Sequence, residues 1–285
     1  MKISSILKSK TVTLSFEVFP PKKADGFEAV EQAARSIAAL RPDFMSVTYG
    51  AGGTTDRYTL ALAETLQSEA GVTVLPHLTC VSSSRAYVED MLKRYEKAGI
   101  CNIMALRGDI PEGGRTAEDF RYACDLIRFV RERSDLCIGG ACYPEGHVES
   151  ASKAEDIRHL KEKVEAGCDF LTTQMFFDNT ILFNFLYRAR EAGIMVPVVA
   201  GIMPVTTAAQ LRRSVSLSGT QVPERFRAIV DHYGSDPAAM KQAGIIYACE
   251  QIIDLIASGI THIHVYSMNK PDVAFGIQRL LEKLL

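Results

Sequence analysis

The stretch Glu165-Ala166-Gly167-Cys168-Asp169-Phe170-Leu171-Thr172-Thr173 decides the fold, because it joins the end of a helical segment to a short apolar run. A glycine just past a helix takes the left-handed conformation that ends it, and the β-rich run that follows is typical of a buried strand. The same joint recurs at Ala98-Gly99 before 102–106, Ala192-Gly193 before 196–200 and Ser258-Gly259 before 261–266. This recurrence predicts a parallel sheet whose strands alternate with helices.

Four further strand-like runs, at residues 13–19, 44–48, 72–79 and 137–142, bring the predicted strands to eight. Most begin about 30 residues after the previous one, the length of one βα unit, and amphipathic stretches such as 86–98 and 154–166 lie between them. The longer gap before the last strand holds the helical stretches 208–215, 223–233 and 237–256. We therefore predict an α/β fold, a (β/α)8 TIM barrel with extra helices between strands seven and eight.

An open, doubly wound sheet is the alternative architecture for this alternation. The first βα turn has no G-x-G-x-x-G sequence, however, and no P-loop pattern occurs. The chain also has no linker, low-complexity run or shift in composition. These features favour the barrel, and we expect a single catalytic domain over residues 1–285.

The charges of the chain nearly cancel, with 32 Lys and Arg against 34 Asp and Glu. Nucleic acids and anionic membrane surfaces attract a local excess of Lys and Arg, so neither partner is expected. The start of the chain lacks the apolar run of about 7–15 residues that a signal peptide needs, which predicts a cytoplasmic protein. The seven cysteines include no C-x-x-C pair, so neither a disulfide framework nor a structural zinc is expected.

Polar side chains gather where the predicted strands end, which is where a barrel of this kind carries its chemistry. In chain order they are Glu17, Thr48, His77, Arg107, Asp109, Tyr143, His147, Gln174, Tyr266 and Asn269. A single polar strand end is readily explained by its emergence into water. So many ends with hydrogen-bonding or charged groups favour a shared site.

Glu17 lies inside a predicted strand, with bulky apolar neighbours on both sides. Alternation along the strand places it on the face opposite Phe16 and Val18, and Pro20-Pro21 ends the strand directly beyond it. A partly desolvated carboxyl has a raised pKa and suits a general acid near neutral pH. A strand-end salt bridge is the alternative role.

Three other motifs each have two interpretations. Arg107-Gly108-Asp109 either binds a heterocycle with mixed donor and acceptor edges or forms an internal ion pair. His262 and His264 share one face of the last strand, where packing is favoured over metal binding because no nearby carboxylate or cysteine completes a ligand set. Met175-Phe176-Phe177 is expected in the core rather than as a stacking platform.

Eight segments together resemble the methylenetetrahydrofolate reductase family in its short bacterial form. In family order they read FEVFPP (16–21), SVTYGA (46–51), PHLTC (76–80), ALRGD (105–109), YPEGH (143–147), LKEKVEAG (160–167), TQMFFD (173–178) and GIMPV (201–205). The resemblance implies a barrel with non-covalently bound FAD that reduces 5,10-methylenetetrahydrofolate to 5-methyltetrahydrofolate. NADH or NADPH would supply the electrons in a ping-pong mechanism, with NADH favoured, and the product would serve methionine synthesis.

The resemblance also implies roles for individual residues. Glu17 matches the general acid that protonates the departing nitrogen of the folate ring, and Asp109 matches the aspartate that stabilises the resulting cation. The implied cofactor contacts are Thr48, Tyr49, Ala51, His77, Arg107, Gly108, Asp109, Ala123, Tyr143, His147, Asp156 and Lys163, with Thr48 toward the nicotinamide. The implied folate contacts are Asp109, Gln174 and Gln210. No metal is implied, and a homo-oligomer is compatible with the family.

Four positions depart from the family pattern. Lys270 replaces a folate-contacting arginine, so a two-pronged grip on a carboxylate becomes a single point charge. Ser214 replaces an apolar side chain near the flavin, and His159 and Glu162 differ from flavin-contacting positions. These changes concern cofactor and folate contacts and leave the proposed chemical groups in place.

Two other functions stay open from the residues. One is a metal-assisted lyase or hydrolase that uses His77, His147 or the pair His262 and His264. The other is a barrel without catalysis of its own, or one that receives electrons from a partner protein. Metal analysis distinguishes the first, and NADH oxidation by the protein alone distinguishes the second.

Overall fold

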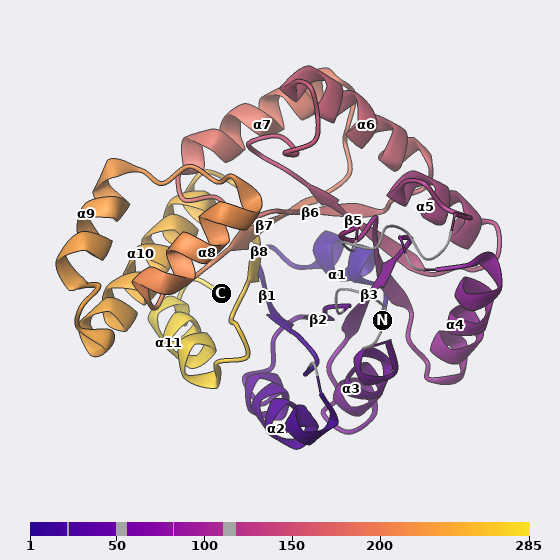
Figure 1. Cartoon of the computed structure of the whole chain (residues 1–285), viewed down its shortest axis with the longest axis horizontal. Coiled ribbons are helices and arrows are strands. Elements are labelled where there is room, and N and C mark those ends of the chain that lie inside the picture. The colour runs from indigo at the N-terminus through magenta and orange to yellow at the C-terminus, as the bar shows by residue number, and fades with distance from the viewer. Residues whose placement is uncertain (22, 50–55, 82, 111–117) are drawn as a thin grey trace.

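The computed structural model describes residues 1–21, 23–49, 56–81, 83–110 and 118–285. Its eight parallel strands form a closed barrel in chain order (Figure 1). They are β1 (Thr13–Val18), β2 (Met45–Val47), β3 (Val74–Thr79), β4 (Asn102–Leu106), β5 (Cys137–Cys142), β6 (Phe170–Thr173), β7 (Val198–Ile202) and β8 (His262–Val265). The sheet closes where β8 pairs with β1, with Ser15 opposite His264. The predicted barrel is confirmed, and the open sheet is wrong.

Helices surround the barrel and cover the outer face of its strands (Figure 1). They are η1 (Ala24–Gly26), α2 (Phe27–Ala38), α3 (Asp56–Ser68), α4 (Arg85–Lys97), α5 (Ala123–Arg131), α6 (Lys153–Glu165), α7 (Asn179–Glu191) and α11 (Pro271–Leu281). The α-helices of this ring present apolar faces inward, as α5 does with the buried Leu126, Ile127 and Val130. Outward-facing strand residues such as Phe16 and Val47 complete this main core.

The helix-to-strand joints have the backbone that the sequence predicts. The φ angle is +67° at Gly99, +115° at Gly167, +84° at Gly193 and +85° at Gly259. A residue with a Cβ is strained in this region, so glycine ends each helix and turns the chain into the next strand.

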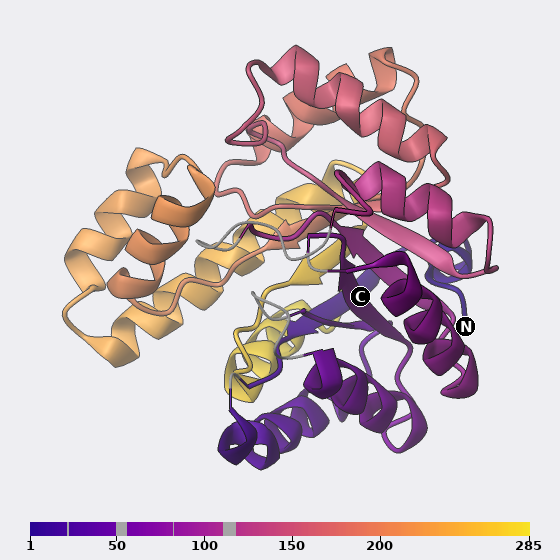
Figure 2. The ribbon, with the colours of Figure 1, turned by 45° about the vertical axis from the view of Figure 1, so that its right-hand side comes forward.

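The predicted insertion between β7 and β8 is also confirmed. It contains α8 (Ala208–Ser218), α9 (Glu224–Tyr233) and α10 (Pro237–Ala257), which form a lobe at one side of the barrel (Figures 1 and 2). Phe226 packs against Phe177 and Tyr247, with ring centroids 5.1 and 4.2 Å apart. The Tyr247 hydroxyl donates to the Phe177 carbonyl at 2.7 Å, so the segment after β6 holds this lobe, and Phe177 is a core residue as expected.

A short helix, α1 (Ile3–Ser9), lies across the amino-terminal ends of the strands. Its buried Ile3, Ile6 and Leu7 pack on inward-facing side chains such as Leu75 and Phe170. The Asn102 side chain at the start of β4 fixes the helix, because its Oδ1 accepts from the Ile3 amide at 2.7 Å. The base of the barrel is therefore closed by apolar contacts.

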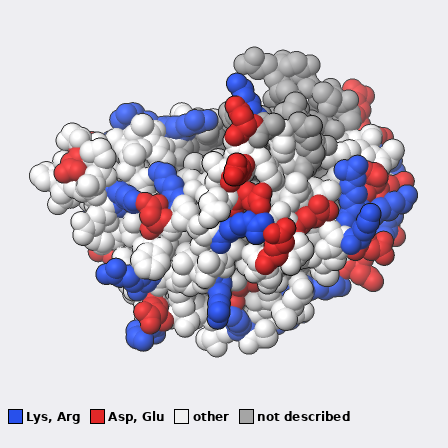
Figure 3. Space-filling view, turned by 90° about the horizontal axis from the view of Figure 1, so that it is seen from below, with Lys and Arg blue, Asp and Glu red and all other residues white. Residues whose placement is uncertain are grey.

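The surface agrees with the balanced charge of the sequence. On the face shown in Figure 3, Lys and Arg side chains lie among Asp and Glu side chains. Within the described ranges, no helix combines the length and the apolar character that crossing a membrane requires.

Candidate active site

Polar side chains occupy the barrel interior above its apolar base. Ser15 and Glu17 of β1 join Ser46 of β2, His77 of β3 and His264 of β8 in contacts across the barrel. The neighbours of Glu17 along the strand belong instead to the outer core. Alternation therefore places the Glu17 carboxyl inside the barrel, as predicted.

A chain of hydrogen-bonding groups connects Glu17 to His264. Nδ1 of His264 lies 2.8 Å from Ser15 Oγ, and its Nε2 lies 3.0 Å from Ser46 Oγ. Ser46 Oγ in turn lies 3.4 Å from Glu17 Oε2. Burial lowers the pKa of His264 to about 3, so the ring is neutral near pH 7. The single Ser46 proton serves either the carboxyl or the imidazole, which couples the protonation of Glu17 to the tautomer of His264.

The Glu17 carboxyl is held in its protonated form up to neutral pH. Burial raises its pKa to about 7, against a smaller lowering by the Ser46 hydrogen bond, and its side chain is 20% exposed. His77 Nε2 lies 3.8 Å from Glu17 Oε2, but burial lowers the pKa of His77 to about 4. A neutral imidazole forms no salt bridge at pH 7. The raised pKa of Glu17 beside a neutral His77 therefore fits a proton donor better than an ion-paired carboxylate.

A cavity of about 570 Å³ opens at the carboxyl-terminal ends of β3, β4 and β5. Its volume is typical of small-molecule sites, which range from about 300 to 1,000 Å³. The predicted residues that line it are Tyr49, Arg107, Gly108, Asp109, Ala123, Tyr143, His147, Asp156 and Lys163. His159 and Glu162, two of the departures from the family pattern, also belong to its wall. The structure thus brings most of the predicted cofactor contacts together.

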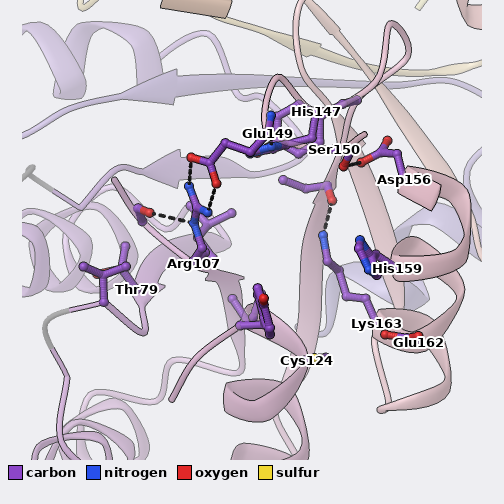
Figure 4. A pocket seen from close by; sticks show the side chains of 18 of the residues that line it. Thr79, Arg107, Cys124, His147, Glu149, Ser150, Asp156, His159, Glu162 and Lys163 are labelled. Carbon is purple, nitrogen blue, oxygen red and sulfur yellow. Dashed lines mark hydrogen bonds and ion pairs between the residues drawn. The ribbon is translucent and has the colours of Figure 1, made fainter. Parts of the chain in front are cut away.

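Arg107 forms a two-pronged ion pair with Glu149 across this cavity (Figure 4). Its Nη2 lies 2.8 Å from Glu149 Oε1, and its Nη1 contacts Glu149 Oε2. The hydrogen bond from Arg107 to Glu149 raises the pKa of the guanidinium. The partner of Arg107 is therefore Glu149 and not Asp109, which is exposed at the cavity mouth. Sequence reasoning missed Glu149.

Lys163 reaches the cavity from α6 (Figure 4), and its stem passes beside Gly140 of β5. A Cβ built on Gly140 would lie 2.9 Å from Lys163 Cδ, so the lysine stem occupies space that a side chain at 140 would need. The ammonium donates to the Ala141 carbonyl at 2.6 Å. The Lys163 side chain is therefore directed to the cavity and not outward into solvent.

The rest of the cavity wall combines aromatic and acidic groups. Tyr143 and His147 meet edge to face with ring centroids 4.6 Å apart. Burial raises the pKa of Tyr143 to about 12 and lowers the pKa of His147, so both side chains are neutral. Asp156 accepts from the Ser150 hydroxyl at 3.2 Å and is fixed at the start of α6.

Five other predicted site residues are not part of this cavity lining. They are Glu17, Thr48, His77, Gln174 and Gln210. Gln174 Oε1 accepts from the Met175 amide at 2.9 Å, and Gln210 Oε1 accepts from the Thr206 amide at 3.0 Å. Lys270 donates to Thr206 Oγ1 at 2.7 Å, which brings it into the same group as Gln210. Ala51 lies outside the described residues.

The histidine pair of β8 is engaged inside the barrel. His262 Nδ1 lies 3.1 Å from Thr13 Oγ1, and both ring nitrogens of His264 contact serine hydroxyls. Packing, the favoured interpretation, accounts for these contacts. In the part of the chain that the structure describes, no group of three or more His, Cys, Asp or Glu residues is placed to hold a metal ion.

Comparison with known proteins gives a consistent result. The family model described as methylenetetrahydrofolate reductase matches residues 2–282. Methylenetetrahydrofolate reductase 1 of Schizosaccharomyces pombe is 36% identical over 294 residues, which cover 100% of this chain and 48% of that protein. The 5,10-methylenetetrahydrofolate reductase of Pectobacterium carotovorum is 34% identical over 267 residues, which cover 93% of this chain and 89% of the relative. The chain thus spans about half of the first relative and most of the second.

A solved structure shares the fold. An uncharacterized protein from Clostridium thermocellum that binds two copies of 5-methyl-5,6,7,8-tetrahydrofolic acid has a TM-score of 0.68 at 13% identity over 100% of both chains. That identity supports a common architecture and no more. From the family match across nearly the whole sequence and the bacterial relative covered over most of its length, the chain belongs to the methylenetetrahydrofolate reductase family.

Proposed function

We propose that the protein reduces 5,10-methylenetetrahydrofolate to 5-methyltetrahydrofolate, with electrons from NADH or NADPH that pass through bound FAD. The mechanism is ping-pong with NADH favoured as donor, and the product supplies methyl groups for methionine synthesis. Glu17 carries the proposal, because its carboxyl lies inside the barrel and keeps its proton up to a pH of about 7. Opening the ring of the substrate needs such a proton donor.

The residues around the cavity fit a flavin dinucleotide. Arg107 and Lys163 present two cations to one space, which suits the pyrophosphate of FAD. Tyr143 and His147 offer aromatic surface beside them. His77 Nε2 is buried without a hydrogen-bond partner among the described residues, so this nitrogen is free to meet a polar edge of the ring system. When bound, FAD supplies the carrier for hydride between the nicotinamide and the folate.

Side chains of the protein supply the proton for ring opening and the negative charge that stabilises the resulting cation. Glu17 donates to the nitrogen that departs as the folate ring opens, and the Ser46 hydroxyl then donates to the carboxylate that remains. Asp109 places a negative charge at the cavity mouth, where it stabilises the cation formed by ring opening. Gln174 and Gln210 contact the folate in this proposal, and Lys270 adds a positive charge near Gln210.

The two half-reactions test the proposal separately. Purified protein must bind FAD, and stopped-flow mixing with NADH and then NADPH measures flavin reduction by each donor. Reoxidation by 5,10-methylenetetrahydrofolate measures the folate step. We expect Glu17→Gln to retain flavin reduction and to slow reoxidation by about 10²- to 10⁴-fold, the contribution of a general acid.

Glu165→Gln is the matched control, because this carboxylate is exposed at the end of α6. It should change neither step. A protein that binds no flavin refutes the proposed function as a whole, whereas equal losses in both half-reactions of Glu17→Gln remove Glu17 from the role of acid.

A further inference from the structure

We propose that Asn269 is a positioning residue for Glu17: its side-chain amide holds the backbone just beyond the carboxyl and fixes that carboxyl in the mouth of the barrel. The proposal rests on the proposed function of Glu17. Asn269 follows β8, and in the sequence it is one polar strand end among several.

The Asn269 amide makes two hydrogen bonds to one backbone unit. Its Oδ1 accepts from the Phe19 amide at 2.9 Å, and its Nδ2 donates to the Phe19 carbonyl at 2.8 Å. A carboxamide has both a donor and an acceptor, so it replaces the pair of bonds that a neighbouring strand would provide. Asn269 therefore continues the sheet beyond the last paired residue.

This replacement is needed because main-chain pairing with β8 ends before Phe19. The register of β1 with β8 ends at Phe16 opposite Val265. The Ser267 hydroxyl then donates to the Glu17 carbonyl at 2.9 Å, and Asn269 holds Phe19. On this side, two side chains extend the sheet past Glu17 to Phe19. Prolines follow at once, and they have no N–H group for a further ladder bond.

The backbone of the loop after β8 is bent to present the amide. Met268 and Asn269 have φ angles of +56° and +54°, the left-handed region. Asparagine enters this region readily, whereas methionine does so at an energetic cost. Two such residues in succession persist only where surrounding contacts enforce them, and such strain is typical of functional sites.

The groups that face Glu17 explain why its position matters. They are the Ser46 hydroxyl of β2, the neutral His77 of β3, the neutral His264 of β8, and the neutral Tyr266 directly after β8. Because none of them is charged near pH 7, exclusion of water is the main cause of the raised pKa of the acid. A segment freed at Phe19 would admit water, lower that pKa and move the carboxyl from its place.

The variant Asn269→Ala tests this role. We expect flavin reduction by NADH to stay within about twofold of the parent, whereas reoxidation by 5,10-methylenetetrahydrofolate slows about tenfold or more, because a small misplacement of a reacting group costs up to about 100-fold. The pH profile of the folate step should shift to lower pH by about one unit.

Asn179→Ala is the matched control. Asn179 Nδ2 also makes two hydrogen bonds, to the Gln251 carbonyl at 3.0 Å and to Asp254 Oδ2 at 2.6 Å, but it joins α7 to α10 on the outside of the barrel. It should alter neither the ratio of the two half-reactions nor the pH profile. Equal losses in both half-reactions of Asn269→Ala with an unshifted profile assign it a purely structural role and overturn the proposal.

A titration of Glu17 provides a readout that needs no folate. Infrared difference spectra of the parent minus Glu17→Gln follow the carboxyl as pH changes, and Asn269→Ala should lower its midpoint. If the parent fails to reduce folate, the proposed function is refuted, but the midpoint of the Glu17 titration still tests whether Asn269 positions the carboxyl. A midpoint that is the same in Asn269→Ala and the parent overturns the positioning role. Should Asn269→Ala not fold, Ser267→Ala removes the contact to the Glu17 carbonyl and carries the same expectations.

Discussion

Gly140 lies directly beneath the side chain of Lys163, and a Cβ at position 140 would come within 2.9 Å of Lys163 Cδ. The missing side chain gives the lysine stem its path from α6 to the carbonyl of Ala141, where the ammonium borders the cavity. A glycine of β5 thus determines where the Lys163 ammonium stands in the cavity.

Gly140→Ala should weaken FAD binding by displacing Lys163. A hydrogen bond to a charged group contributes about 1.5–3 kcal/mol, so loss of the contact should raise the Kd about 10- to 100-fold. Flavin fluorescence titration measures the change. The added methyl also crowds Cys168 Sγ, so Lys163→Met should be measured beside it. Lys161→Met, exposed on the same helix, is the control and should bind FAD as the parent does.

Glu149→Gln should strengthen FAD binding. The Glu149 carboxylate occupies the face of Arg107 that an anionic phosphate needs, and Glu149 is 57% exposed. Exposed ion pairs contribute up to about 1 kcal/mol, so removal of the competing charge should tighten binding by about 2- to 5-fold. The same fluorescence titration at low and high salt checks this. Weaker binding would mean that Glu149 holds Arg107 in place for the ligand instead of competing with it.

Glu17→Gln should change how stability depends on pH. The folded pKa of about 7 lies above the ordinary value of 4.5, so the folded protein binds the proton more tightly than the unfolded chain does. Stability from this group is therefore present below pH 4.5 and is lost as pH rises to 7, by about 3 kcal/mol. Urea unfolding at pH 4.5 and 8 measures the free energy of unfolding of both proteins. Relative to the parent, that of Glu17→Gln should be higher at pH 8 than at pH 4.5 by this amount. An unchanged difference at the two pH values would contradict the burial of the acid.

His77→Gln should reduce the loss of stability in acid. The folded pKa of His77 is about 4, below its ordinary value of 6.5, so the unfolded chain binds the proton more tightly. The contribution of His77 to the free energy of unfolding is fully present above pH 6.5 and falls by about 3 kcal/mol as pH drops to 4. Chemical unfolding across this range should show a shallower decline in the variant. His232→Gln, exposed on α9, should follow the parent, and a parallel decline in His77→Gln would refute the prediction.

Ile3→Ala should destabilise the protein without affecting the cavity. Ile3 is fully buried against the base of the barrel, and truncation of such a side chain costs about 2–5 kcal/mol. Thermal unfolding measures the loss, and FAD affinity should equal that of the parent because the cavity lies at the opposite end. Ile246→Ala, at a position 44% exposed, should change stability by no more than about 0.5 kcal/mol.

The barrel could be predicted from the sequence because its decisive features are local. A glycine that ends a helix, followed by a β-rich run, specifies one joint, and four repeats of the joint specify a parallel sheet. The first helix was missed because seven residues are too few to show a period, and its anchor Asn102 lies 99 positions from Ile3. The seventh strand begins at Val198 rather than at residue 196, since Pro197 has no N–H for the ladder.

In the candidate site, too, local sequence features could be predicted, whereas contacts between distant positions could not. Alternation was sufficient to place Glu17 inside the barrel, but the groups that surround it come from closure of the sheet. Ser46 and His264 are 218 positions apart and meet only because β8 pairs with β1. Glu149 lies 42 positions from Arg107 on a loop without a period, so no local pattern marks it as the partner.

Helix α1, which closes the base of the barrel, affects the order in which ligands would bind and leave. Among the described residues, Ile3, Ile6 and Leu7 close the amino-terminal strand ends, so ligands would enter the interior from the end that carries Glu17. A hydride donor and a folate that both react there would share one entrance. Each would have to depart before the other binds, so a product that stays bound would block the next substrate.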